Sequence, residues 1–128
     1  MRALILAFLL APPALAENRM TAEAFDAFAT GRTLTYQQPD IVFGTEEYLP
    51  GRRVRWSDGT AGCYAGSWFP KDGEICFLYQ GTTEPACWSF VQEGDRVSAT
   101  SSDDAERLVY DVVISKTALP CSGLKEGP

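Results

Sequence analysis

The 128-residue chain contains no histidine. Histidine is the side chain that most often acts as a general base near neutral pH, and it is also the commonest metal ligand. Serine and cysteine triads therefore lack their usual base. Glycine-rich phosphate loops and calcium loops of the D-x-D-x-D-G type are missing as well. We therefore expect no catalytic residue, no metal and no cofactor, and a protein that is not an enzyme.

A pair of carboxylates is the one hydrolytic arrangement that the composition still permits, because glycosidases use two acidic side chains. Glu46 with Glu47 and Asp103 with Asp104 are the nearest candidates. Adjacent residues in a strand point to opposite faces, so such neighbours seldom act together. A carboxylate-dependent glycan hydrolase is therefore kept as an alternative.

Long hydrophobic runs are absent beyond the first residues. Arg2 precedes an apolar block, 3–11, that is too short to span a bilayer, and Ala14-x-Ala16 offers the small side chains that signal peptidase requires. We predict a signal peptide over 1–16 and a single disulfide-stapled domain over 17–128 that is exported from the cytoplasm. No later segment is apolar enough for a membrane span.

Closely spaced cysteine pairs are also lacking. Four cysteines are present, Cys63, Cys76, Cys87 and Cys121, and none of them forms the C-x2-C spacing typical of zinc sites. An even number of cysteines in an exported chain predicts two disulfides.

Basic residues are outnumbered, 11 against 17 acidic ones, and the formal net charge is −6. Such a surface disfavours nucleic acid and anionic membranes and leaves cationic partners open. The sequence does not indicate the oligomeric state.

One segment is typical of a helix, Ala22–Thr30. Thr21 is placed to cap it, Met20 and Phe25 occupy the positions of a hydrophobic staple, and Gly31 suits a left-handed C-terminal residue.

After Arg32 the chain alternates between strand-forming runs and turn residues. The predicted strands are Thr33–Gln37, Arg52–Ser57, Thr60–Phe69, Glu74–Gln80, Ala86–Gln92, Arg96–Ser101 and Arg107–Ser115. Hairpins at this spacing predict an antiparallel β-meander or small barrel. The fold class is therefore mainly β, with one N-terminal helix and two disulfides.

Hairpin registers predict which residues share a face. A two-residue turn at Glu93-Gly94 places Phe90 opposite Val97. The predicted core face carries Trp68, Ile75, Phe77, Tyr79, Trp88, Phe90, Val97, Ala99, Leu108, Tyr110 and Val112. Cys76 and Cys87 then lie directly opposite each other on the other face. We predict a Cys76–Cys87 disulfide and, by elimination, Cys63–Cys121.

One hairpin conflicts with this register. A two-residue turn at Asp58-Gly59 places Val54 and Trp56 on the face of the cysteines and the neighbouring arginines on the aromatic face. We interpret this as a β-bulge at Gly62 or Gly66, because glycine inside a strand often marks a bulge. The alternative is a sheet that is apolar on both sides.

Arginines are concentrated in the segment 48–56 of an otherwise acidic chain. Guanidinium groups bind oxyanions, so the candidate ligand-binding residues are Arg53, Arg55, Trp56 and Tyr64. The alternative is that the arginines pair with nearby acids such as Glu46 and Glu47.

Five aromatic residues of the predicted core face have two interpretations, namely Trp68, Phe77, Tyr79, Trp88 and Phe90. They could line a ligand cavity, as in small lipocalin-like barrels, or they could simply form a core that Phe25 and Phe28 cover.

The segment Phe43–Val54 (FGTEEYLPGRRV), with Gly62-Cys63, Gly66-x-Trp68, Ile75-Cys76-Phe77-x-Tyr79 and Cys87-Trp88-x-Phe90, resembles small exported alphaproteobacterial proteins classed as a domain of unknown function. The resemblance runs from Ala22 to about Cys121. It implies a Gram-negative periplasmic setting and a disulfide-bonded β domain, and it implies no activity.

The chain is also loosely similar to periplasmic lysozyme inhibitors, which are small exported β-barrels with disulfides. Gly62–Ser67 is the segment nearest to their Ser-Gly-x-x-Tyr inhibitory motif. The leading hypothesis is a non-catalytic binding or envelope-associated module whose partner is an envelope protein or glycan. An inhibitor of a cationic hydrolase such as lysozyme is the second.

Overall fold

The computed structural model describes residues 18–60, 62–121 and 123–125, and the predicted signal peptide lies outside them. The elements are α2 (Ala22–Ala29), β1 (Thr33–Gln38), β2 (Ile41–Leu49), β3 (Arg53–Ser57), β4 (Cys63–Lys71), β5 (Glu74–Tyr79), β6 (Ala86–Glu93), β7 (Arg96–Ser101), β8 (Val109–Ile114) and β9 (Leu124–Lys125). In the described part of the chain, no helix is long and apolar enough to cross a membrane.

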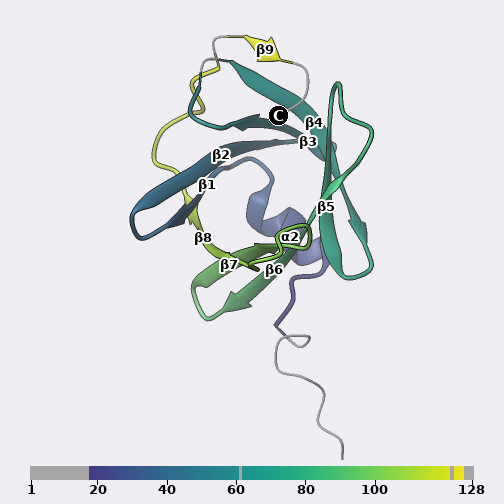
Figure 1. Ribbon diagram of the computed structural model, residues 1–128. Coiled ribbons are helices and arrows are strands. Elements are labelled where there is room, and N and C mark those ends of the chain that lie inside the picture. The colour runs from purple at the N-terminus through teal and green to yellow at the C-terminus, as the bar shows by residue number, and fades with distance from the viewer. Residues whose placement is uncertain (1–17, 61, 122, 126–128) are drawn as a thin grey trace, which may run out of the picture.

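The first eight strands form a closed antiparallel barrel (Figure 1). Each strand pairs with the next one along the chain, and β1 pairs with β8 to close the ring. The short β9 lies parallel to the start of β4. The mainly β fold with one helix and two disulfides is therefore confirmed, in its barrel form.

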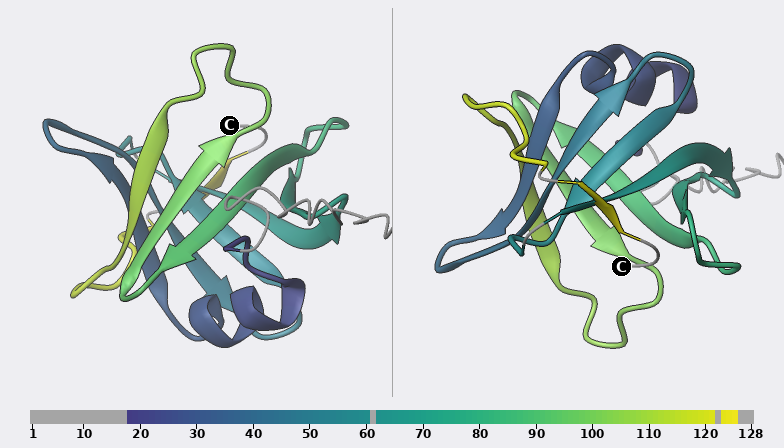
Figure 2. Two further views of the ribbon diagram at one scale, coloured as in Figure 1. Left: turned by 90° about the horizontal axis from the view of Figure 1, so that it is seen from below. Right: turned by 90° about the horizontal axis from the view of Figure 1, so that it is seen from above.

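Helix α2 closes one end of the barrel, and the β7–β8 connection lies at the other end (Figure 2). The predicted capping of the helix is present, because Thr21 Oγ1 accepts a hydrogen bond from the Ala24 amide at 3.1 Å and Gly31 follows with φ of +84°. Phe25 is fully buried, and its ring contacts those of Tyr48, Trp68, Phe77 and Phe90 at centroid distances of 4.6–6.5 Å. The helix therefore supplies part of the barrel core.

The seam between β5 and β6 is the shortest stretch of pairing between consecutive strands of the barrel. It contains three residue pairs, from Ile75 with Trp88 to Phe77 with Ala86. At the helix end, residues 18–20 bond to β6 where β5 does not, with the Met20 amide donating to the Phe90 carbonyl at 2.8 Å. At the other end, residues 78–85 leave β6. The barrel wall is therefore split between β5 and β6 at the end away from the helix.

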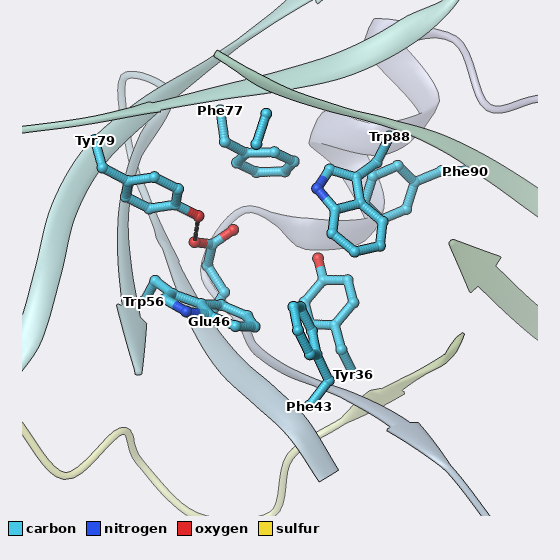
Figure 3. Close-up of a pocket in the computed structure, with 9 residues that line it drawn as sticks. Tyr36, Phe43, Glu46, Trp56, Phe77, Tyr79, Trp88 and Phe90 are labelled. Carbon is cyan, nitrogen blue, oxygen red and sulfur yellow. Dashed lines mark hydrogen bonds between the residues drawn. The ribbon is translucent and has the colours of Figure 1, made fainter. Parts of the chain in front are cut away.

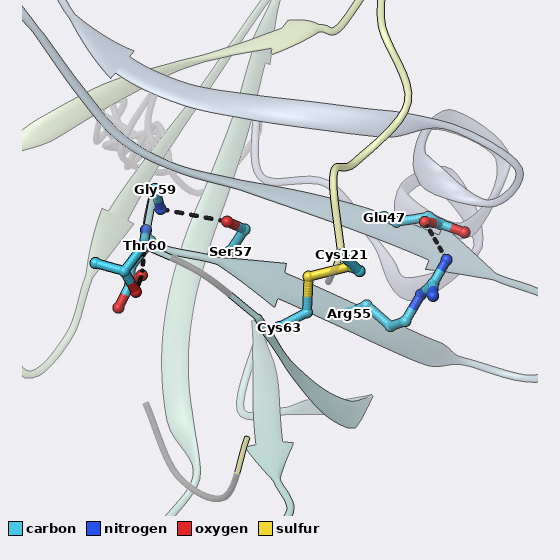
Figure 4. Close-up of a disulfide and its surroundings, with 8 residues drawn as sticks. Glu47, Arg55, Ser57, Gly59, Thr60, Cys63 and Cys121 are labelled. Carbon is cyan, nitrogen blue, oxygen red and sulfur yellow. Dashed lines mark hydrogen bonds and ion pairs between the residues drawn. A yellow bond between two sulfur atoms is a disulfide. The ribbon is translucent and has the colours of Figure 1, made fainter. Parts of the chain in front are cut away.

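Both predicted disulfides are confirmed. Cys76 lies directly opposite Cys87 in the middle of the β5–β6 seam, as the hairpin register predicted. Cys63 bonds to Cys121 and attaches the C-terminal segment to β4 (Figure 4). The Cys63 amide also donates to the Gly123 carbonyl at 2.7 Å.

Most of the predicted core face is buried. Its buried members are Trp68, Ile75, Phe77, Phe90, Val97, Ala99 and Val112. The assignment of Leu108 to the core face is wrong, because this residue lies before β8 and is exposed. The β6–β7 turn is Gly94-Asp95, so Phe90 lies opposite Ala99 and not Val97. A shift of two residues preserves side-chain facing, which explains why the predicted face survives this error.

The predicted bulge in β4 is wrong, and a longer β3–β4 loop resolves the register conflict instead. Trp56 lies opposite Tyr64, so residues 57–63 separate the two partners. The Asp58 carboxylate accepts from the Thr60 amide at 3.0 Å, which stabilises a local turn in place of a two-residue hairpin. The pairing is displaced by an odd number of residues, which turns Val54 and Trp56 into the barrel.

Strand β2 was not predicted, nor was β9. The segment 41–49 contains an internal glycine and two adjacent glutamates, which disfavour strand assignment. Its inward-facing residues at the helix-side half of the strand are Gly44, Glu46 and Tyr48. A buried glutamate on the barrel interior breaks the apolar alternation by which strands are recognised.

Candidate functional site

The end of the barrel away from α2 encloses a cavity of about 140 Å³ (Figure 3). Its lining residues are Tyr36, Phe43, Glu46, Trp56, Phe77, Tyr79, Ala86, Trp88 and Phe90. They come from β1, β2, β3, β5 and β6, including both sides of the split seam. An apolar cavity of about 150 Å³ is large enough for benzene, so this one has room for a small organic molecule.

A β-bulge brings Phe43 to this cavity. Tyr36 pairs with Gly44 and Gln37 pairs with Val42, so Phe43 has no partner across the β1–β2 hairpin. Bulges redirect side chains that regular alternation would send to the other face. Phe43 thus lines the mouth of the cavity while 42% of its surface remains exposed.

Gly44 allows Trp56 to occupy the cavity wall. A Cβ atom at Gly44 would stand 2.2 Å from the Trp56 indole, much closer than van der Waals contact. The absence of a side chain at this position therefore decides where the indole lies.

Four aromatic rings form a continuous cycle around the cavity. The distances between ring centroids are 5.8 Å for Tyr36 and Trp56, 5.4 Å for Trp56 and Phe43, 5.9 Å for Phe43 and Trp88, and 6.3 Å for Trp88 and Tyr36. Tyr110 packs against this cycle from β8, with its ring centroid 4.9 Å from that of Phe43. Such edge-tilted contacts hold the rings in place.

Glu46 is buried at the inner side of this cycle, with 2% of its surface exposed. The Tyr79 hydroxyl donates to Glu46 Oε2 at 2.5 Å, and the Tyr48 hydroxyl is a second hydrogen-bond partner. The hydroxyls of Tyr36 and Tyr48 are themselves hydrogen-bonded to each other. In Figure 3 the second carboxyl oxygen of Glu46 faces the space between Phe77 and Tyr36.

Burial changes the acidity of this cluster. Loss of hydration raises the pKa of Glu46 to about 7, although hydrogen bonds from Tyr79 and Tyr48 lower it in part. Burial also raises the pKa of Tyr36, Tyr48 and Tyr79, and the nearby Glu46 carboxylate raises each further. The tyrosines therefore remain neutral near pH 7, where Glu46 changes its charge.

The predicted ligand-binding residues do not form one site. Trp56 lines the cavity, and Tyr64 is buried without lining it. Arg53 and Arg55 alternate with Val54 and Trp56 and face outward from β3. Arg55 forms an ion pair with Glu47 at 2.7 Å (Figure 4), as the alternative interpretation of this segment expected.

The two candidate carboxylate pairs are also separated. Glu46 faces the interior, whereas Glu47 faces outward toward Arg55. Asp104 accepts from the amides of Glu106 and Leu108, both at 3.0 Å, and so stabilises its own exposed loop. The Glu46 and Glu47 carboxylates therefore do not share a common space. Among the described residues, no group of three or more His, Cys, Asp or Glu side chains is arranged to hold a metal ion.

In the segment that resembles the lysozyme-inhibitor motif, Cys63 and Tyr64 are both buried. Ala65 and Gly66 are half-buried and Ser67 is exposed, and the inhibitor interpretation stays a prediction.

Comparison with known proteins finds no matching family model, no matching curated protein and no matching solved structure. The resemblance to small exported alphaproteobacterial proteins stays a prediction. The site is therefore interpreted from its own residues.

The sequence prediction missed Tyr36 and Phe43 as site residues, and it considered Glu46 only as a catalytic acid or as a partner of the arginines. The alternation Gly44-x-Glu46-x-Tyr48 was the available signal, since it continues the period of two through the segment that was left unassigned. The Phe43 bulge has no comparable signal.

Proposed function

We propose that this protein is a non-catalytic periplasmic binding module that holds one small organic ligand in the open half of its barrel. The observation that carries this proposal is an aromatic cavity with one carboxyl group buried in its wall. Concave, mostly apolar sites with few polar groups are the usual form of small-molecule sites.

The lining residues are exposed in a graded way that suits ligand access. Tyr36, Glu46 and Phe90 are buried at the base, Trp56 and Trp88 are half-buried, and the mouth residue Phe43 is 42% exposed. Apolar residues outside the mouth are exposed as well, namely Ile41, Val42, Leu108 and Val109. An apolar ligand would therefore meet apolar surface before it entered the cavity.

The buried carboxyl group is poorly explained by stability alone. Moving an ionised carboxylate out of water is unfavourable, and an apolar side chain at position 46 would avoid that penalty. Perturbed acids in clefts are more frequent at functional sites than elsewhere. The cavity volume suits a compact molecule of small size, so we narrow the proposed partner from a glycan chain to a small molecule.

Tryptophan fluorescence tests this function directly, because Trp56 and Trp88 are two of the three tryptophans in the chain. The protein would be titrated with a panel of small amines, alcohols, carboxylic acids and aromatic compounds. We expect a saturable emission change with at least one class. Glu47→Gln is the matched control, since Glu47 lies next to Glu46 but faces outward. If no class gave saturable binding and an apolar dye also failed to bind, the aromatic face would be core alone.

A further inference from the structure

We propose that the ligand is a small organic cation, whose substituted ammonium group lies within the cycle of aromatic rings with the Glu46 carboxylate as its counter-ion. This inference rests on the proposed binding function and specifies its ligand class. Three features of the cavity lead to it: the arrangement of the rings, the sign of its charge and its volume.

The ring arrangement resembles what cations require. The four centroid distances of 5.4–6.3 Å close a quadrilateral of Tyr36, Trp56, Phe43 and Trp88. The mean position of the four centroids lies within about 6 Å of each of them, which is the range of cation–π attraction. Substituted ammonium groups are bound in this way because several ring quadrupoles replace the lost hydration.

The charge of the site has one sign. Glu46 is the one charged side chain among the described residues that line the cavity. The titratable groups facing it are Tyr36 from β1, Tyr48 from β2 and Tyr79 from β5, and all three are neutral phenols near pH 7. Strands β3 and β6 contribute only tryptophan, phenylalanine and alanine side chains.

This charge pattern discriminates among ligand classes. An anion would meet the Glu46 carboxylate without any basic partner, since Arg53 and Arg55 lie on the outer face. A cation would neutralise the ionised carboxylate, and ion pairing is strengthened where water is excluded. A neutral ligand would gain no such ion pair, and one that accepts a hydrogen bond from the protonated acid has a distinct pH signature.

The volume selects compact head groups. A cavity of about 140 Å³ suits a tetramethylammonium or choline-sized ion and excludes large polycations from the interior. Longer substituents on the ammonium group would have to extend out of the cavity through the mouth beside Phe43.

Isothermal titration calorimetry at pH 8 compares three matched compounds with the full chain. Choline is the cation, 3,3-dimethylbutan-1-ol is its uncharged isostere, and 3,3-dimethylbutanoate is the anion of similar shape. We expect choline to bind at least about tenfold more tightly than the alcohol, and the anion not to bind. Equal binding of choline and the alcohol would overturn the cation inference but leave the binding function intact. Binding of none of the three, nor of any other small compound, would overturn both.

Variants identify the residues responsible. Glu46→Gln keeps the shape and a hydrogen-bond acceptor for Tyr79, so we expect it to reduce the choline preference to about the level of the alcohol. Glu47→Gln should retain the preference. Phe43→Leu removes a ring but keeps an exposed apolar side chain. We expect this change to lower the affinity for choline more than the affinity for the alcohol. Circular dichroism of each variant verifies folding, and unchanged choline preference in folded Glu46→Gln would contradict the proposal.

The pH dependence distinguishes a cation from a neutral hydrogen-bond acceptor. Because Glu46 has a pKa of about 7, its ionised fraction rises about tenfold between pH 6 and pH 8. Choline affinity should rise about tenfold over this interval and release protons at pH 6, whereas Glu46→Gln should show no change. A choline affinity that does not rise with pH would contradict the ion pair with Glu46. An affinity for the uncharged alcohol that falls as the pH rises would show that the protonated acid donates a hydrogen bond to a neutral ligand.

Discussion

The two halves of this barrel are both rich in aromatic side chains but differ in what the rings surround. At the helix end, the rings of Tyr48, Trp68, Phe77 and Phe90 surround Phe25 of α2, which fills the space between them. At the other end, a similar cycle surrounds a cavity of about 140 Å³ with Glu46 in its wall. The difference comes from the chain connection, since one helix before β1 can fill only one end of the barrel.

The two halves differ in the features that bear on stability and on the proposed binding. The closed half holds the largest fully buried rings, and the seam beside it is completed by residues 18–20. The open half has a split seam, exposed apolar residues at its mouth and a buried acid. We expect changes in the closed half to alter stability most, and changes in the open half to alter binding most.

The largest effect is expected in the closed half, from Phe25→Ala. This change leaves a cavity among four rings, so we expect the free energy of unfolding to fall by about 3–5 kcal/mol. Urea denaturation followed by circular dichroism measures it, and Phe28→Ala, at a half-buried position on the same helix, is the control. A loss below about 1 kcal/mol would show that the helix does not fill this half.

The second effect belongs to Glu46 in the open half. Its pKa is raised from 4.5 to about 7 in the folded state, so the folded protein binds this proton more tightly than the unfolded chain does. The corresponding stability is fully present below about pH 4.5 and is lost as the pH rises through about 7. We expect the difference between wild type and Glu46→Gln to change by about 3 kcal/mol between pH 4 and pH 8 in the absence of ligand.

Urea denaturation at a series of pH values measures this difference directly. Glu47→Gln serves as the control because Glu47 is outward-facing. Parallel pH profiles for wild type and Glu46→Gln would mean that Glu46 ionises as freely in the folded state as in water.

The third effect tests the seam between the two halves. Replacing Cys76 and Cys87 together by serine removes the link across three residue pairs, and we expect a loss of about 3 kcal/mol for a loop of this length. Hydrogen exchange should accelerate first at 75–77 and 86–88. Uniform acceleration through β1 and β8 would show that the seam is no weaker than the rest of the wall.

The smallest effect on stability, with a clear effect on binding, is expected from Phe43→Ala. Because this residue is 42% exposed, its truncation should lower the free energy of unfolding by only about 1–2 kcal/mol. Loss of one ring from the cycle should lower the affinity for choline by about fivefold. Thermal unfolding and calorimetry measure the two quantities, and a large stability loss with unchanged affinity would reverse the comparison.

Local chemistry explains why part of the fold was predictable. The capping threonine, the staple and the C-terminal glycine mark the helix independently of its surroundings. Regular hairpins gave the neighbours of each later strand, and the register placed Cys76 opposite Cys87. Errors of two residues, as at the β6–β7 turn, left the faces unchanged because side-chain facing repeats every two residues.

The candidate site was less predictable, because it depends on odd-numbered displacements. The β3–β4 loop length decides whether Trp56 faces inward or outward, and the bulge at Phe43 decides whether that ring reaches the cavity. Both reverse the facing of a side chain without a strong local signal. Glu46 was considered only as a surface or catalytic acid, since a charged residue is rarely assigned to a barrel interior.

Local sequence patterns specified the helix, the order of most strands, the disulfide pairing and the inward-facing aromatic residues of the later strands. Each of these depends on residues near one another along the chain or on adjacent hairpins. The pairing of β1 with β8, the filling of one end by α2 and the cavity at the other end, with Glu46 in its wall, follow from the three-dimensional arrangement. Closure of the barrel pairs strands that are distant along the chain. Which end is filled by α2 and which end keeps a cavity therefore depends on packing between distant segments.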